Sequence, residues 1–199
     1  MSDVTLNDGK ILVKLARKFI EAHFSNVDVK IPDLELLNEE RGIFVTLKRY
    51  PSNELRGCIG YIEGIMPLRN AIKEIAILSA FRDPRFPPIR REELEHLIVE
   101  VSILTPPELI KVKNPEDYLH EIEIGRDGLI AEFESRRGLL LPQVPVEWKW
   151  NEEEFLSHTC MKAGLSSDSW KNLKVKIYKF KAEVFSEEEP NGKVIKVEL

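Results

Sequence analysis

The strongest constraint on the fold is a series of short segments rich in β-branched and aromatic residues, each bounded by turn residues. Residues 43–49 and 55–62 form the first pair, and Pro51-Ser52-Asn53 between them is typical of a tight turn. Strands joined by so few residues pair in an antiparallel fashion. The sequence therefore predicts an α+β fold with a mainly antiparallel sheet and flanking helices. Further strands are predicted at 97–105, 122–124, 129–133, 139–141, 175–184 and 194–199. The strands at 122–124, 129–133 and 139–141 are predicted to form two successive hairpins.

Helices are predicted where apolar residues recur every three or four positions. Pro84 ends one of them, because a proline disfavours helical geometry at the residue before it. Asn151 and Glu154 form the pattern of a capping box at the start of another, which Gly164 ends. The predicted helices cover residues 7–23, 67–83, 115–121 and 151–164.

Length and charge indicate a globular chain that is not generally attracted to nucleic acid. The chain has 199 residues, of which 43% are hydrophobic, and its net charge is -5. Residues 1–10 carry no export signal, and no segment approaches the roughly 20 apolar residues of a membrane helix. No linker is visible. We therefore expect a single domain over residues 1–199, located in the cytoplasm, with no membrane partner.

Metal and cofactor motifs are missing from the sequence. Two cysteines exclude a disulfide-rich scaffold and a four-cysteine zinc site. There is no glycine-rich dinucleotide or phosphate loop and no calcium-binding loop, and the four histidines lack ligand spacing. No metal is expected, and the sequence assigns no cofactor.

The LRGCIG segment at 55–60 places Cys58 between Gly57 and Gly60. In a strand, Arg56 and Cys58 project from the same face, roughly 6–7 Å apart. Glycine within a strand indicates a bulge or the close approach of another group, and an arginine beside a thiol lowers the thiol pKa. The segment predicts a candidate catalytic Cys58 with Arg56 as an anion partner. A buried cysteine that packs as a small apolar residue fits the same spacing.

The DPRFPP segment at 83–88 is held extended by its three prolines, which leave it little entropy to lose. It presents Asp83 and Arg85 rigidly as candidate ligand-binding residues. Four arginines between positions 82 and 91 would suit a phosphate or carboxylate, and the glutamates directly after them offset that charge. A purely structural segment anchored by Phe86 also fits.

Gln143 is the third candidate, because it stands alone in an apolar, proline-bounded run at 138–145. A buried amide without partners costs about 1–3 kcal/mol. Gln143 therefore bonds either a ligand or a neighbouring backbone, and the sequence favours neither.

A second cysteine, Cys160, lies two residues after His158 on a predicted helix. Residues two apart on a helix point to different faces, so a buried structural Cys160 is favoured over a cysteine–histidine site. A disulfide between Cys58 and Cys160 and a pairing of Cys58 with His158 stay open, although cytosolic redox conditions disfavour the disulfide.

The LRGCIG and DPRFPP segments, in this order, resemble the AMMECR-one domain family, and the resemblance covers residues 15–184. It implies an α+β fold with a larger part built from both chain ends and a smaller part beside it, and a motif near a cleft between the parts. Prokaryotic relatives are often encoded beside Memo-like and radical-SAM proteins, which implies a shared modification pathway with such partners. The resemblance implies no particular reaction.

Three functions follow from these patterns. The favoured one is a small-ligand or substrate site, with or without catalysis. A nucleic-acid or nucleotide module rests on the arginines and on analogy of fold. A protein–protein adaptor rests on the apolar proline runs with Trp148 or Trp150. The favoured site would be lined by Arg56, Gly57, Cys58, Gly60, Asp83, Arg85 and Gln143.

Overall fold

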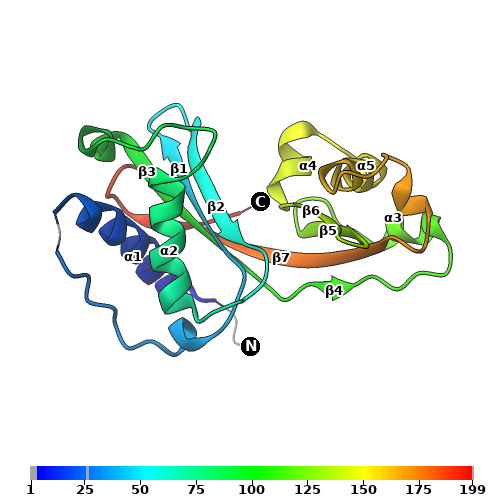
Figure 1. The fold of residues 1–199 in the computed structure, drawn as a ribbon, viewed down its shortest axis with the longest axis horizontal. Helices are drawn as coiled ribbons and strands as arrows, with labels where there is room; N and C mark the ends of the chain where they lie inside the picture. Colours follow the sequence, from blue (N-terminus) through cyan, green and yellow to red (C-terminus); the bar gives the residue numbers. More distant parts are fainter. Residues whose placement is uncertain (1–3, 26, 199) are drawn as a thin grey trace. The chain divides into compact units, whose positions relative to one another are not determined.

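The computed structural model describes residues 4–25 and 27–198, which form two compact units. Unit 1 extends to Leu104 and also includes Glu183–Glu198, whereas unit 2 is Thr105–Ala182. Figure 1 shows the chain coloured along its sequence. Within the described ranges, no helix is long and apolar enough to cross a membrane. That the whole chain forms one domain stays a prediction.

The sheet of unit 1 is built on the first predicted strand pair. Strand β1 (Ile43–Arg49) pairs antiparallel with β2 (Leu55–Tyr61) and with β3 (Leu97–Leu104), so β2 lies at the edge. Strand β7 (Lys176–Glu187) ends in this unit, where it pairs with β8 (Val194–Val197). The hairpin predicted from the turn at Pro51-Ser52-Asn53 is thereby confirmed.

Helices α1 (Leu6–Ser25) and α2 (Leu68–Phe81) pack against this sheet and against each other (Figure 1). Their apolar stripes, which the three- and four-residue spacing predicted, are the buried faces. The result is the hydrophobic core of unit 1, in which the fully buried residues include Leu12, Ala16, Val45, Ile72, Ile75 and Val101.

Unit 2 has its own sheet and core. Strand β5 (Asp127–Phe133) pairs with β6 (Arg136–Leu140) on one side and with the first part of β7 on the other. Helix α5 (Glu152–Lys162) packs on β5 and β6. The shorter elements of the chain are η1 (Glu35–Asn38), η2 (Arg91–His96), β4 (Glu108–Leu109), η3 (Pro115–Asp117), α3 (Tyr118–Glu121), α4 (Gln143–Trp148) and η4 (Ser169–Lys171).

The α+β class is confirmed, and so is the capping box of α5. The Asn151 side chain accepts the Glu154 N–H at 2.9 Å, and Gly164 after the helix has a φ of 73°. The strand predicted at 122–124 is wrong, because both edges of β5 are already paired by β6 and β7. The short elements β4 and α4 were not predicted.

Candidate functional site

The LRGCIG segment lies in β2, and helix α2 packs closely against this strand. A Cβ atom on Gly57 would lie 2.2 Å from the backbone oxygen of Ser79 in α2, so only glycine allows this approach. The register between β1 and β2 also shifts at Leu47 and Lys48, opposite Arg56. The close approach and the bulge that the glycines predicted are both present, and they set the distance between β2 and the end of α2.

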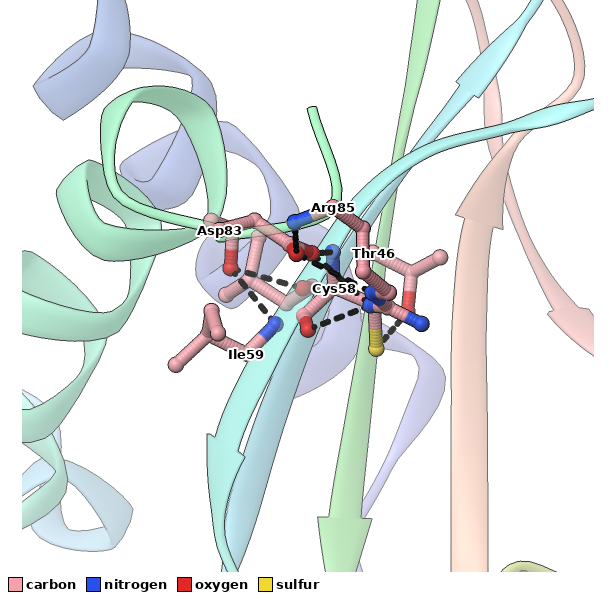
Figure 2. Close-up of polar contacts among 7 residues, drawn as sticks. Thr46, Cys58, Ile59, Asp83 and Arg85 are labelled. Carbon is pink, nitrogen blue, oxygen red and sulfur yellow. Dashed lines mark hydrogen bonds and ion pairs between the residues drawn. The ribbon is translucent and has the colours of Figure 1, made fainter. Parts of the chain in front are cut away.

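Asp83 follows the end of α2 and binds the backbone of β2 (Figure 2). Its buried carboxylate accepts the Cys58 N–H at 2.8 Å through Oδ2, and it accepts the Arg85 N–H at 3.0 Å through Oδ1. The guanidinium of Arg85 donates to both carboxylate oxygens, at 3.0 Å and 2.7 Å. Nη2 of Arg85 also donates to the Cys58 carbonyl at 3.0 Å.

Together, Asp83 and Arg85 satisfy both backbone groups of Cys58 that an edge strand would leave open. We call this arrangement the Asp83–Arg85 clamp. The Arg85 bonds and the Cys58 N–H bond hold the pKa of Asp83 to about 2, although burial acts to raise it. The clamp therefore holds the backbone of Cys58 in place with an ionised, buried carboxylate, which accepts the Cys58 N–H.

The thiol of Cys58 lies on the same sheet face as Thr46 and Glu100, which are its register partners on β1 and β3. Thr46 donates its hydroxyl to Sγ at 3.3 Å. Burial raises the pKa of Cys58 above its ordinary value, and the Thr46 bond and the charge of Arg85 only partly offset this effect. The thiol is consequently neutral at neutral pH.

Arg56 does not serve as the anion partner of the thiol, so this expectation is corrected. It is buried and donates from Nε and Nη2 to the two carboxylate oxygens of Glu93, at 2.9 Å and 3.1 Å. Its guanidinium carbon also lies 5.9 Å from the ring centroid of Phe86. A bidentate carboxylate was available 37 positions along the chain, and a buried guanidinium requires such a partner.

Sequence reasoning missed the hydroxyl of Ser79. It accepts the Ile59 N–H at 3.0 Å and donates to the Val45 carbonyl at 2.8 Å, which links α2 to both strands of the first hairpin. The available signal was one buried polar residue on the otherwise apolar face of a helix.

Gln143 belongs to unit 2, whereas Cys58, Asp83 and Arg85 belong to unit 1. Gln143 is the first residue of α4, and its Oε1 is buried without a hydrogen-bond partner among residues 4–25 and 27–198. Its predicted role in ligand binding stays a prediction.

The structural role expected of Cys160 is confirmed, whereas the pairing of Cys58 with His158, which belongs to the other unit, stays a prediction. Cys58 and Cys160 are both free thiols, and Cys160 is fully buried in the core of unit 2. The His158 ring stacks on Trp150 with 3.8 Å between centroids. In the described part of the chain, no group of three or more histidine, cysteine or acidic side chains could hold a metal ion.

Solvent reaches the clamp directly. Half of the Arg85 side chain (53%) is exposed, and Cys58 is half-buried. A pocket of about 620 Å³ in unit 1 and another of about 310 Å³ in unit 2 are lined by residues other than Cys58, Asp83 and Arg85. The two motif segments are thus in direct contact, and the cleft predicted for them stays a prediction.

Comparison with known proteins places this chain in a family. The AMMECR1 profile, which is that of the AMMECR-one domain family, matches residues 13–185. The chain belongs to the AMMECR1 family. Protein MJ0810 of Methanocaldococcus jannaschii is 54% identical over 98% of both chains. Protein MK0488 of Methanopyrus kandleri is 54% identical over 96% of this chain and 94% of its own length.

A solved relative has the same fold. The crystal structure of the uncharacterized protein PH0010 from Pyrococcus horikoshii matches with a TM-score of 0.89 and 51% sequence identity. The match covers 96% of this chain and 97% of that one. The fold described above is therefore that of an experimentally determined relative.

Proposed function

We propose that this AMMECR1 chain binds a small anionic ligand or substrate at the edge of β2, between Arg85 and the thiol of Cys58. The observation that carries the proposal is the Asp83–Arg85 clamp, which fixes both side chains beside solvent. Nη1 of Arg85 makes no hydrogen bond to residues 4–25 or 27–198, so it is available to a carboxylate or phosphate oxygen.

The state of the thiol favours binding over nucleophilic catalysis. The thiolate is the nucleophilic form of cysteine, and burial raises the pKa of Cys58. A neutral thiol that accepts a bond from Thr46 instead presents a polarisable contact surface beside the guanidinium. Cys58 is in this proposal a ligand contact, and it becomes a nucleophile only where a bound substrate or partner lowers its pKa.

Protection of Cys58 from alkylation tests the proposal. The probes are inorganic phosphate and citrate at constant ionic strength, with N-ethylmaleimide as the reagent and peptide mass spectrometry as the readout. At least one anion is expected to slow the alkylation of Cys58 in the natural chain. Neither anion is expected to slow it in Arg85→Gln. The exposed Arg82 outside the clamp supplies the charge-matched control, Arg82→Gln, which should retain protection.

Two results would reject anion binding at this place. One is that neither anion slows the alkylation of Cys58 in the natural chain. The other is that protection is the same in Arg85→Gln and in the control. Arg85→Lys keeps the charge but loses the paired donors, and it should show intermediate protection.

The pathway that the family resemblance implies is part of the same proposal. We infer a cytoplasmic role beside Memo-like and radical-SAM proteins, with the Cys58–Arg85 edge as the ligand site. Co-purification of the tagged chain with such proteins from its own cells would support this role. Their absence from a cross-linked preparation would argue against it.

An adaptor function is the second candidate, because unit 2 exposes a large aromatic side chain. Trp148 is 68% exposed and stacks on Trp150 with 6.1 Å between ring centroids, and Val146 beside it is 46% exposed. Exposed tryptophans are enriched at protein interfaces. A pull-down with Trp148→Ala should lose partners that the natural chain retains, and an unchanged set of partners would remove this candidate.

A further inference from the structure

A pocket of about 620 Å³ lies in unit 1, apart from the clamp. Its first wall is the turn between β1 and β2, from Arg49 to Ser52. Its second wall is η2 together with Arg90 before it and Leu97 after it. The volume falls within the range of roughly 300–1,000 Å³ that small-molecule sites occupy.

Backbone hydrogen bonds hold the two walls together. The Tyr50 N–H donates to the His96 carbonyl at 2.8 Å, which ties the turn to the end of η2. On the second wall, the Arg90 N–H donates to the Glu93 carboxylate at 2.8 Å, and the Glu93 N–H returns a bond to the Arg90 carbonyl at 3.0 Å. The Tyr50–His96 bond thus fixes the position of the turn relative to η2.

The negative charge of Glu93 is already paired with Arg56, which does not line the pocket. Arg56 binds both of its carboxylate oxygens, and the Arg90 N–H binds one of them as well. Burial acts to raise the pKa of Glu93, but these bonds and the nearby charge of Arg49 lower it below its ordinary value. The carboxylate is therefore ionised, and its charge is already balanced by the guanidinium of Arg56.

The remaining charges of the pocket favour an anion. Arg49 and Arg90 line opposite walls, are exposed, and form no ion pair within residues 4–25 and 27–198. The lining holds two carboxylates, those of Glu92 and Glu93, and Glu93 is already paired with Arg56. His96 adds a ring that can donate a further hydrogen bond.

The apolar part of the lining limits the ligand class further. Tyr50, which is 42% exposed, and Leu97, which is 2% exposed, both line the pocket. A flat organic group fits such a surface, whereas a free inorganic ion would leave it uncovered.

We propose that this pocket binds a phosphomonoester, with the phosphate between Arg49 and Arg90 and the organic group against Tyr50 and Leu97. Two guanidinium groups from opposite walls suit a phosphate, because its oxygens accept several charge-assisted hydrogen bonds at once. The site is independent of the Cys58–Arg85 edge.

Binding is tested with phenyl phosphate, followed through the backbone amide signals of an isotope-labelled sample. Phenyl phosphate is expected to shift the amides of Tyr50 and His96 in a saturable way. Arg49→Gln and Arg90→Gln are each expected to lower its affinity about tenfold, because each removes a charge-assisted contact. Both side chains are exposed, so both variants should fold.

Matched variants separate this pocket from the clamp. Arg82→Gln removes one exposed positive charge elsewhere, and Arg85→Gln removes the guanidinium of the clamp. Both are expected to leave the dependence of the Tyr50 and His96 amide shifts on phenyl phosphate concentration unchanged. Because these two amides report on the pocket, binding of the same probe at the clamp does not enter this measurement.

The assignment is overturned if phenyl phosphate shifts no amide of the pocket, or if Arg82→Gln weakens binding as much as Arg49→Gln. Phenol or benzoate binding as tightly as phenyl phosphate would also contradict it, since the phosphate would then contribute nothing. Inorganic phosphate should bind more weakly than phenyl phosphate, and equal affinities would exclude a role for Tyr50 and Leu97.

Discussion

Replacement of Arg17 by methionine is expected to lower the free energy of unfolding by about 3–5 kcal/mol, the usual cost of removing one partner from a buried ion pair. Arg17 in α1 donates to both carboxylate oxygens of Glu187 at the end of β7, at 2.6 Å and 2.5 Å. Both side chains are buried. The variant leaves the buried carboxyl of Glu187 without its counter-ion inside unit 1.

The backbone of β3 depends on the same pair, which adds to the expected loss. Nη2 of Arg17 also donates to the Leu97 carbonyl at 2.6 Å, and Glu187 accepts the Val99 N–H at 2.9 Å. The pair thus joins α1 and the end of β7 to β3. Urea unfolding at neutral pH measures the effect, with the exposed Lys18→Met on the same helix as control. A loss below about 1 kcal/mol, as at a surface pair, would contradict this role.

Asp83→Asn is the second large effect, with an expected loss of about 2–3 kcal/mol at neutral pH. The replacement keeps the shape of the side chain but removes the charge that binds Arg85 and the Cys58 N–H. Hydrogen bonds to a charged group contribute more than neutral ones, and the amide would direct a donor at another donor. Asp33→Asn, at an exposed aspartate of the same unit, is the control.

The loss at Asp83 should depend on pH in a direction that the structure sets. The pKa of Asp83 is lowered from 3.8 to about 2, so the folded state binds this proton less readily than the unfolded state. The stabilisation is therefore complete above about pH 5 and is lost as the pH falls toward 2. The difference between the natural chain and Asp83→Asn should shrink over that interval. A constant difference down to pH 3 would show that the charge of Asp83 is not its cause.

Local patterns predicted the elements that carry the site. The β-branched run of β1 and the proline after Asp83 gave strand and helix limits close to those observed. The glycine at position 57 indicated a close approach before its partner, Ser79, was known. These predictions succeeded because strand alternation, proline geometry and the missing glycine Cβ act over a few residues.

The pairing of distant polar groups could not be predicted in the same way. Arg56 is joined to Glu93 by the fold rather than by sequence spacing, and several glutamates near that position were equivalent in the sequence. The expected effect of Arg56 on the thiol failed for this reason. The prediction of a strand at 122–124 was wrong because a strand needs an open sheet edge to pair with. Both edges of β5 are already paired, with β6 and with β7. Gln143 was grouped with Cys58 because it is a single amide in an apolar, proline-bounded run, and this local pattern does not show that Gln143 belongs to the other unit.

The ionisation of Cys58 tests the central claim most directly, because the clamp is proposed to hold a neutral thiol beside a ligand-binding guanidinium. The measurement is the rate of iodoacetamide labelling of Cys58 between pH 6 and pH 10 (about one point per half unit), with each cysteine followed by peptide mass spectrometry. The account predicts an apparent pKa above the ordinary 9.0 for Cys58 and no labelling of the buried Cys160 in the folded chain. An apparent pKa well below 9.0 for Cys58 in the folded chain would identify an activated nucleophile and contradict the binding role.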